Sequence, residues 1–306
     1  MPAAATADAA APVRRSGQAP FQAAGDRWAI LAAAILWGTT GTAATFAPWG
    51  TSSLAVGAAA MGFGGILLLV AAGRRALVLV ADKSVRAPLV VGAACVAIYP
   101  LAFYTSMAKA GVAVGVTLTI GSSPIAAAVI ERIVDGRRLS ARWAATTAVA
   151  VVGAVLLGSS GAHLGRPGPA MTGIALALTA GFCYAGYSVA AARLVSAGTE
   201  SPAAMGGMFG LAAAVLLPVL AVTGPALLST GRGLAVTGYL AVVPMGLGYV
   251  LFGRGLRHTP ASTATAISLV EPVVAAVLAF LVVNQHLAVA GWVGIVLIAA
   301  SVAALS

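Results

Sequence analysis

The stretch ISLVEPVVAAVLAF, residues 267–280, combines a membrane-spanning pattern with two residues that such segments rarely hold. It lies within an apolar run over residues 261–283, and about 20 such residues cross a bilayer as a helix. Glu271 is an acid at membrane depth, which costs about 2.5–3.5 kcal/mol. Pro272 has no amide N–H and crowds the carbonyl of Ser268, so we expect the helix to kink or open there. These residues predict a functional site. The alternative is a kinked helix whose glutamate only braces the bundle.

The whole chain has the composition of an integral membrane protein. Of its 306 residues, 60% are hydrophobic and 8% are charged, whereas soluble domains average about 25% charged residues. Lipid admits only helices and closed barrels, and the continuous apolar runs lack the short alternating segments of a barrel. We therefore predict an all-α integral membrane protein with the lipid bilayer as its surroundings.

Ten apolar runs are candidate membrane spans. They cover residues 28–46, 52–72, 88–108, 112–134, 142–159, 171–193, 202–223, 234–252, 261–283 and 289–305. The predicted organisation is a disordered cytoplasmic N-terminus over residues 1–27, a first five-helix repeat over 28–159, a linker over 160–170 and a second five-helix repeat over 171–306. Ten spans suffice for a carrier, so we expect a monomer.

The basic residues predict the orientation. With the N-terminus inside, all but three of the 17 basic residues fall in cytoplasmic segments, and only Lys109, Arg166 and Arg232 lie outside. The positive-inside rule then places both termini in the cytoplasm. The net charge of +10 is explained by these loops, so no nucleic-acid partner is expected. The N-terminal segment lacks the order of a cleaved signal peptide, and we expect a multi-pass protein of a bacterial inner membrane.

The two halves correspond to each other along the sequence. A shift of 148 residues places Pro124 on Pro272, and a second pair, Pro100 and Pro244, lies 144 residues apart in corresponding spans. Because each half has an odd number of spans, the halves must have opposite orientations. Matched, proline-interrupted spans in an inverted repeat indicate the midplane site of a secondary transporter. The alternative is that prolines are simply common in membrane helices.

Polar and aromatic side chains at mid-depth near these prolines are the candidates for a solute site. The predicted solute-binding residues are Trp37, Thr40, Tyr99, Phe103, Thr119, Ser123, Tyr184, Tyr187, Ser268 and Glu271. The predicted helix breaks are Pro100, Pro124, Pro244 and Pro272. For any single aromatic residue, bundle packing or an interfacial belt is the alternative. With no basic residue at mid-depth, such a cavity suits apolar or amphipathic solutes better than phosphorylated ones.

The sequence contains no motif for nucleotide hydrolysis or metal binding. There is no GxxxxGK[ST] phosphate loop, and His163, His258 and His286 are scattered without a metal-ligand cluster. We therefore expect no catalytic residue, no metal and no cofactor. Glu131 lies near the cytoplasmic end of its span and is expected to pair with a neighbouring arginine: Arg132, Arg137 or Arg138.

Four short motifs carry a family resemblance. They are Leu36-Trp37-Gly38, Ser123-Pro124, Glu271-Pro272 and the run Leu287…Gly291-Trp292…Gly294. With ten spans in a 5+5 arrangement, the chain resembles EamA-type permeases of the drug/metabolite transporter superfamily over residues 28–305, and among them the YddG-like amino-acid exporters. The resemblance implies alternating-access export of small organic metabolites, with aromatic or neutral amino acids as the expected solutes.

The chain departs from that family pattern at three places. The family usually has an arginine in the second span, near Ala60-Met61 of this chain. It usually has Gly-Glu after the fourth and ninth spans, where this chain reads Gly136-Arg137 and Asn284-Gln285. These losses put in doubt a gating or coupling mechanism that relies on those charges.

The mechanism of energy coupling stays open at this level. If protons drive transport, as in a proton-coupled drug or nucleoside efflux permease, Glu271 is the residue expected to bind and release the proton. Facilitated export needs no titrating group. Two other classes are an intramembrane enzyme, which would gather catalytic side chains at one depth, and a passive channel, which would show charge rings or a filter motif. The sequence shows neither pattern, and we predict no enzyme.

Overall fold

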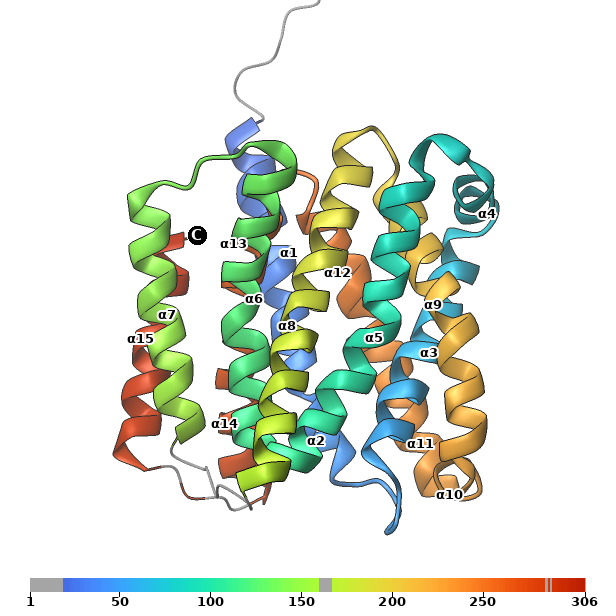
Figure 1. Cartoon of the computed structure of the whole chain (residues 1–306), viewed down its shortest axis with the longest axis vertical. Helices are drawn as coiled ribbons and strands as arrows, with labels where there is room; N and C mark the ends of the chain where they lie inside the picture. Colours follow the sequence, from blue (N-terminus) through green and yellow to red (C-terminus); the bar gives the residue numbers. More distant parts are fainter. Residues whose placement is uncertain (1–18, 160–166, 284–285, 287, 306) are drawn as a thin grey trace, which may run out of the picture.

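The computed structural model describes residues 19–159, 167–283, 286 and 288–305, and every regular element in them is a helix (Figure 1). The predicted N-terminal segment up to residue 18, most of the predicted linker and the Asn284-Gln285 pair lie outside these residues. The helices in chain order are α1 (Ala19–Gly38), α2 (Thr40–Ala44), α3 (Ser53–Ala72), α4 (Arg74–Ala81), η1 (Lys83–Val85), α5 (Arg86–Ala110), α6 (Val112–Asp135), α7 (Ala141–Ser159), α8 (Pro167–Ser196), α9 (Ser201–Thr223), α10 (Pro225–Leu228), α11 (Gly231–Leu240), η2 (Ala241–Leu247), α12 (Gly248–Gly255), α13 (Ala261–Ile267), α14 (Val270–Val283) and α15 (Val289–Leu305).

Eight helical segments of the described chain are long and apolar enough to cross a bilayer. They are α3, η1 with α5, α6, α7, α8, α9, the run α11–η2–α12, and α13 with α14. The apolar α15 has 17 residues and is shorter. The prediction of an all-helical, multi-pass membrane protein is confirmed, and the count of ten spans stays a prediction.

Three of the predicted apolar runs are not single α-helices. Residues 28–46 divide between α1 and α2, and residues 261–283 divide between α13 and α14. Residues 241–247 form a π-helix, η2, between α11 and α12. Each irregularity adjoins a residue that weakens an α-helix: Gly38, Pro272 and Pro244.

The segment between the second and third predicted spans contains a short helix that the apolar runs did not predict. The eight-residue α4 lies across the end of the bundle and is seen nearly end-on in Figure 1. It buries Ala76 and Leu79 and exposes Leu77 and Val78. Its length is far below that of a span, so α4 lies along the bundle end rather than through it.

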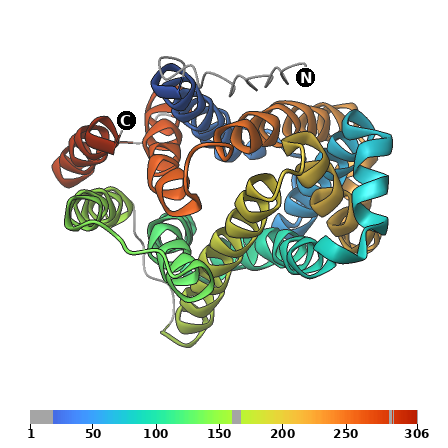
Figure 2. The ribbon, with the colours of Figure 1, turned by 90° about the horizontal axis from the view of Figure 1, so that it is seen from above.

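The most extensive packing joins helices that are distant in the sequence. It pairs α5 with α8, α3 with α9, α7 with α15 and α6 with α8, and α1 packs on α12. Figure 2, viewed along the bundle, shows α7 and α15 side by side at one edge. Close approach depends on small residues: a Cβ added at Gly206 of α9 would lie 2.7 Å from the carbonyl oxygen of Leu68 in α3.

One end of the bundle carries most of the positive charge. The junctions α3–α5, α6–α7, α8–α9 and α12–α13 lie together at the end where α1 begins (Figure 1). They hold Arg74, Arg75, Lys83, Arg86, Arg132, Arg137, Arg138, Arg142, Arg193, Arg254 and Arg257. We call this the basic end. The opposite end holds Lys109 and Arg232.

Candidate functional site

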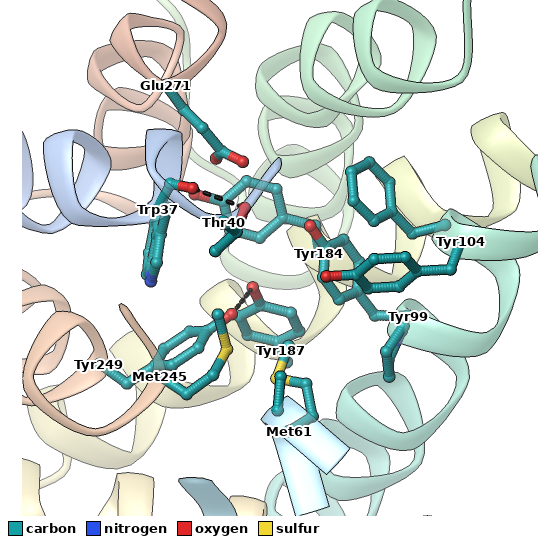
Figure 3. A pocket seen from close by; sticks show the side chains of 13 residues that line it. Trp37, Thr40, Met61, Tyr99, Tyr104, Tyr184, Tyr187, Met245, Tyr249 and Glu271 are labelled. Atoms are coloured by element: carbon teal, nitrogen blue, oxygen red, sulfur yellow. Dashed lines mark hydrogen bonds between the residues drawn. The ribbon is translucent and has the colours of Figure 1, made fainter. Parts of the chain in front are cut away.

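A small pocket of about 30 Å³ lies inside the helix bundle (Figure 3). Helices from both halves of the chain line it: α1, α2, α3 and α5 from the first half, and α8, η2, α12 and α14 from the second. The lining residues are Trp37, Thr40, Ala60, Met61, Tyr99, Pro100, Phe103, Tyr104, Tyr184, Tyr187, Met245, Tyr249 and Glu271. We call this the central pocket.

Most of the predicted solute-binding residues lie together in this pocket. Trp37, Thr40, Tyr99, Phe103, Tyr184, Tyr187 and Glu271 line it, whereas Thr119, Ser123 and Ser268 do not. The predicted helix breaks differ among themselves. Helices α5 and α6 continue through Pro100 and Pro124, whereas Pro244 lies in η2 and Pro272 follows the break between α13 and α14.

The three predicted hydroxyls outside the pocket bind helix carbonyls. Thr119 donates to the carbonyl of Ala177 in α8 at 3.0 Å. Ser123 donates to the carbonyl of Thr119 at 2.6 Å, and Ser268 to that of Ala264 at 3.0 Å. Such bonds satisfy a buried hydroxyl donor locally.

Five lining residues were outside the predicted set: Ala60, Met61, Tyr104, Met245 and Tyr249. Tyr104 directly follows Phe103, so its proximity to Pro100 was a usable signal. Met245 directly follows the predicted helix break at Pro244, which was a usable signal in the same way. The family pattern expects an arginine near Ala60-Met61, and this chain instead presents alanine and methionine to the pocket.

Aromatic rings form the walls of the pocket. Trp37 lies with its ring centroid 4.9 Å from that of Tyr249 and 6.1 Å from that of Tyr184. Tyr187 lies 5.3 Å from Tyr184 and 6.0 Å from Tyr99, centroid to centroid. The hydroxyls of Tyr187 and Tyr249 share a hydrogen bond of 2.8 Å between their oxygens (Figure 3). Adjacent rings at these separations hold each other in place.

The π-helix η2 positions two of these residues. Pro244 has no N–H to donate within the helix, and the wider π-turn accommodates this loss. The indole Nε1 of Trp37 donates to the carbonyl of Pro244 at 2.9 Å. This bond ties η2 to α1 and places Met245 and Tyr249 against the pocket.

The break between α13 and α14 places Glu271 in the first turn of α14. The carbonyl of Ser268 lacks the usual partner because Pro272 has no N–H, and it accepts from the amide of Glu271 at 2.9 Å instead. The Glu271 side chain points into the pocket (Figure 3). Among the described residues its carboxylate has no hydrogen bond or ion pair. The hydroxyl of Tyr184 is likewise buried without a hydrogen-bond partner in the described chain.

A wider cavity of about 730 Å³ opens at the basic end. Its charged lining residues are mixed in sign and include Glu131, Asp135, Arg137, Arg193 and Arg257. Where side chains are described, the structure contains no group of three or more His, Cys, Asp or Glu residues that could hold a metal ion.

Glu131 does not make the predicted pair with a neighbouring arginine. Its carboxylate accepts from the hydroxyl of Ser262 at 2.6 Å and from the Ser262 amide at 3.3 Å. Ser262 is in the first turn of α13, where unpaired amides favour a negative group. Glu131 therefore caps a helix of the other half of the chain, 131 residues away, and is almost fully buried.

A second polar contact between the two halves of the chain lies at the basic end. Asp26 of α1 is buried and contacts His258 Nδ1, and its Oδ1 lies 3.7 Å from Arg254 Nε of α12. The side chain of His258 is half-exposed. Together the Asp26 and Glu131 contacts join α1 to α12 and α6 to α13 at the basic end.

We expect Glu131→Gln to lower the free energy of unfolding by about 1–3 kcal/mol, because the neutral amide weakens a buried, charge-assisted helix cap. Thermal unfolding of the purified protein in detergent measures the change. Asp135→Asn is the matched control, because Asp135 lies one turn further along α6. Its side chain is 39% exposed, and its contact is a surface ion pair with Arg193 Nε at 3.6 Å. Equal destabilisation by both variants would contradict the capping role.

A family model, a curated relative and a solved structure each match most of the chain. The model of the EamA-like transporter family matches residues 25–159 and 171–306. The uncharacterized transporter YwfM of Bacillus subtilis (strain 168) is 34% identical over 270 residues, which cover 88% of this chain and 89% of YwfM. A protein of known crystal structure shares the fold, with a TM-score of 0.74 and 18% identity over 92% of this chain and 96% of its own.

Proposed function

The chain belongs to the EamA-like transporter family and is a transporter rather than an enzyme, and on that premise we propose that it moves small organic solutes by alternating access around the central pocket. The observation that carries this proposal is the pocket itself. Both halves of the chain line it, and its walls are aromatic. Two polar groups, the Glu271 carboxylate and the Tyr184 hydroxyl, face it without a hydrogen-bond partner among the described residues. Apolar walls with a few placed polar groups are typical of small-molecule sites.

The helix pairing supports a 5+5 inverted repeat of ten spans over residues 28–159 and 171–306. In this proposal, the first five spans are α1–α2, α3, α5, α6 and α7. The last five spans are α8, α9, α11–α12, α13–α14 and α15. The pair α5–α8 then joins spans three and six, and the pair α1–α12 joins spans one and eight. Span three corresponds to span eight, and span six corresponds to span one. A two-fold relation exchanges these two pairs. The pairs α3–α9, α6–α13 and α7–α15 each join a span to its own counterpart, and the same relation maps each of these pairs onto itself.

The charge distribution supports cytoplasmic termini in a bacterial inner membrane. The basic end would face the cytoplasm by the positive-inside rule, and the wide cavity there would open inward. In that state solute would enter from the cytoplasm, as export requires. A single chain encloses the central pocket, so a monomer suffices. Rocking of the two halves would close the basic end and open the opposite side.

Two versions of the transport reaction remain, and each has a supporting feature. The family resemblance points to facilitated export of aromatic or neutral amino acids, and the aromatic walls suit their rings. Proton-coupled efflux of drugs or nucleosides is supported by Glu271, since an unpaired carboxylate away from water is stabilised by a proton or a cation. Under an imposed pH gradient, wild type concentrates solute only in the coupled version.

Counterflow in proteoliposomes tests transport. We expect labelled solute to accumulate transiently when unlabelled solute is inside, and Tyr104→Ala to change the KM about 10-fold, because burial of an aromatic ring against a solute contributes about 1–2 kcal/mol. Phe182→Ala, on the exposed face of α8, is the matched control and is expected to behave as wild type. Non-saturating flux without counterflow would contradict a carrier and indicate a channel, and chemical conversion of the solute would indicate an enzyme.

A further inference from the structure

Glu271 is the carboxylic acid of the central pocket, and no basic residue faces it there. Among the 13 residues that line the pocket, it is the one acid, and the set contains no arginine, lysine or histidine. Its side chain is buried at 9% exposure, with no hydrogen bond or ion pair to any described residue. A buried, unpaired charge is unfavourable by several kcal/mol. A cation from outside the protein would complete this site.

The surrounding rings favour the same kind of ligand. Tyr99 and Tyr184 lie 5.9 Å apart, and Trp37 and Tyr249 lie 4.9 Å apart, centroid to centroid. The face of an aromatic ring attracts an ammonium group within about 6 Å of its centroid, by about 0.5–2 kcal/mol. The rings also stack on an aromatic part of the ligand. An acid enclosed by rings is thus complementary to an amine that carries its own ring.

The Tyr184 hydroxyl adds a second polar contact. It is buried, lines the pocket and has no hydrogen-bond partner in the described chain. A phenolic oxygen can accept a hydrogen bond as well as donate one. Ammonium N–H groups could therefore reach Glu271 and Tyr184 together, which would satisfy both unpartnered groups.

A carboxylate on the ligand would find no partner in the same pocket. The start of α14 could attract an anion, but two of its first three residues, Glu271 and Pro272, have no free amide to offer. The amide of Leu269 donates to Ala266, the amide of Glu271 donates to Ser268, and Pro272 has no amide hydrogen. A ligand carboxylate would also lie close to the Glu271 carboxylate and be repelled.

We propose that the central pocket selects small aromatic amines with a single positive charge over the amino acids that carry the same ring. This inference rests on the proposed transport function and narrows its solute class. The ammonium group lies between Glu271 and Tyr184, and the ligand ring lies against Trp37, Tyr99 and Tyr249. The pocket of about 30 Å³ is closed around this position, so binding moves side chains apart. Met61 and Met245 are the adaptable parts of the wall.

Equilibrium binding to the purified protein tests this selectivity separately from transport. The probe is tritiated tryptamine, displaced by unlabelled tryptamine, tryptophan or tryptophol, which share the indole ring and differ in charge. We expect tryptamine to bind at least about 10-fold more tightly than either competitor, since one charge-assisted contact contributes about 1.5–3 kcal/mol. In Glu271→Gln the preference should fall to about threefold or less. Glu200→Gln, at an exposed acid paired with Arg75, should keep it.

The alternative outcomes separate the amine selectivity from the transport function. Equal affinity for tryptophan and tryptamine, a preference that survives in Glu271→Gln, or failure of tryptamine to bind would each overturn the amine selectivity. Counterflow of the same solutes could still proceed in those cases, and the transport function would stand. Tight, Glu271-dependent binding of tryptamine with no counterflow for any solute would instead overturn transport and leave the amine site in place.

Discussion

Trp37→Ala is expected to lower the free energy of unfolding by about 3–5 kcal/mol, the usual cost of removing a large buried aromatic side chain. Trp37 is 4% exposed and lies with its ring centroid 4.9 Å from Tyr249 and 5.1 Å from Phe252. Its indole is also the donor to the carbonyl of Pro244. Without it, a buried carbonyl loses its partner, which adds to the cost of the cavity.

The same substitution should disturb the pocket through η2. Because the Trp37–Pro244 bond ties the π-helix to α1, its loss should release Met245 and Tyr249 from their places in the wall. Thermal unfolding in detergent measures the stability change. Trp292→Ala is the matched control, since Trp292 of α15 is 45% exposed and should cost less than about 1 kcal/mol. Similar destabilisation by both variants would contradict the anchoring role of Trp37.

Gly57→Val is expected to abolish counterflow while the protein still folds. A Cβ at residue 57 of α3 would lie 2.5 Å from Tyr104 Cδ2 and 2.8 Å from its Cε2, well inside the ordinary carbon–carbon separation of about 3.5–4.0 Å. The ring of Tyr104 must therefore move, and the free space beside it is the central pocket. We expect the displaced ring to fill that space, with a loss of stability of about 1–3 kcal/mol from overpacking.

Gly238→Val is the matched control for this steric block. Gly238 is also within a helix of the bundle, α11, but a Cβ there would meet nothing within 4 Å. Counterflow by the two variants at equal amounts of folded protein is the measurement. Wild-type counterflow in Gly57→Val would show that solute does not pass the space beside Tyr104.

The features that the sequence predicted well depend on local chemistry. The apolar runs predicted the helices because each backbone group in lipid must be satisfied within its own helix. Pro272 predicted the irregular backbone between α13 and α14 because a missing amide affects its own turn. The short α4 escaped prediction because an eight-residue amphipathic segment between spans has no clear apolar run.

The site was predicted only in part because its remaining members depend on distant contacts. Glu131 has arginines close by in sequence, but its partner is Ser262 of the other half. Thr119 and Ser268 were plausible solute ligands by depth, yet both hydroxyls bind helix carbonyls. Met61 and Met245 face the pocket through the packing of α3 and η2. Such pairings follow from helix packing, which a single sequence does not specify.

The most direct test of the central claim is a crystal structure of the protein with 5-bromotryptamine, located by the anomalous signal of its bromine. We predict a single ligand in the central pocket, with its ring among Trp37, Tyr99 and Tyr249 and its ammonium group toward Glu271. The bound state should show Tyr104 and the two methionines displaced from their positions in the closed pocket. A ligand found only in the basic-end cavity, with the central pocket still closed, would contradict the account.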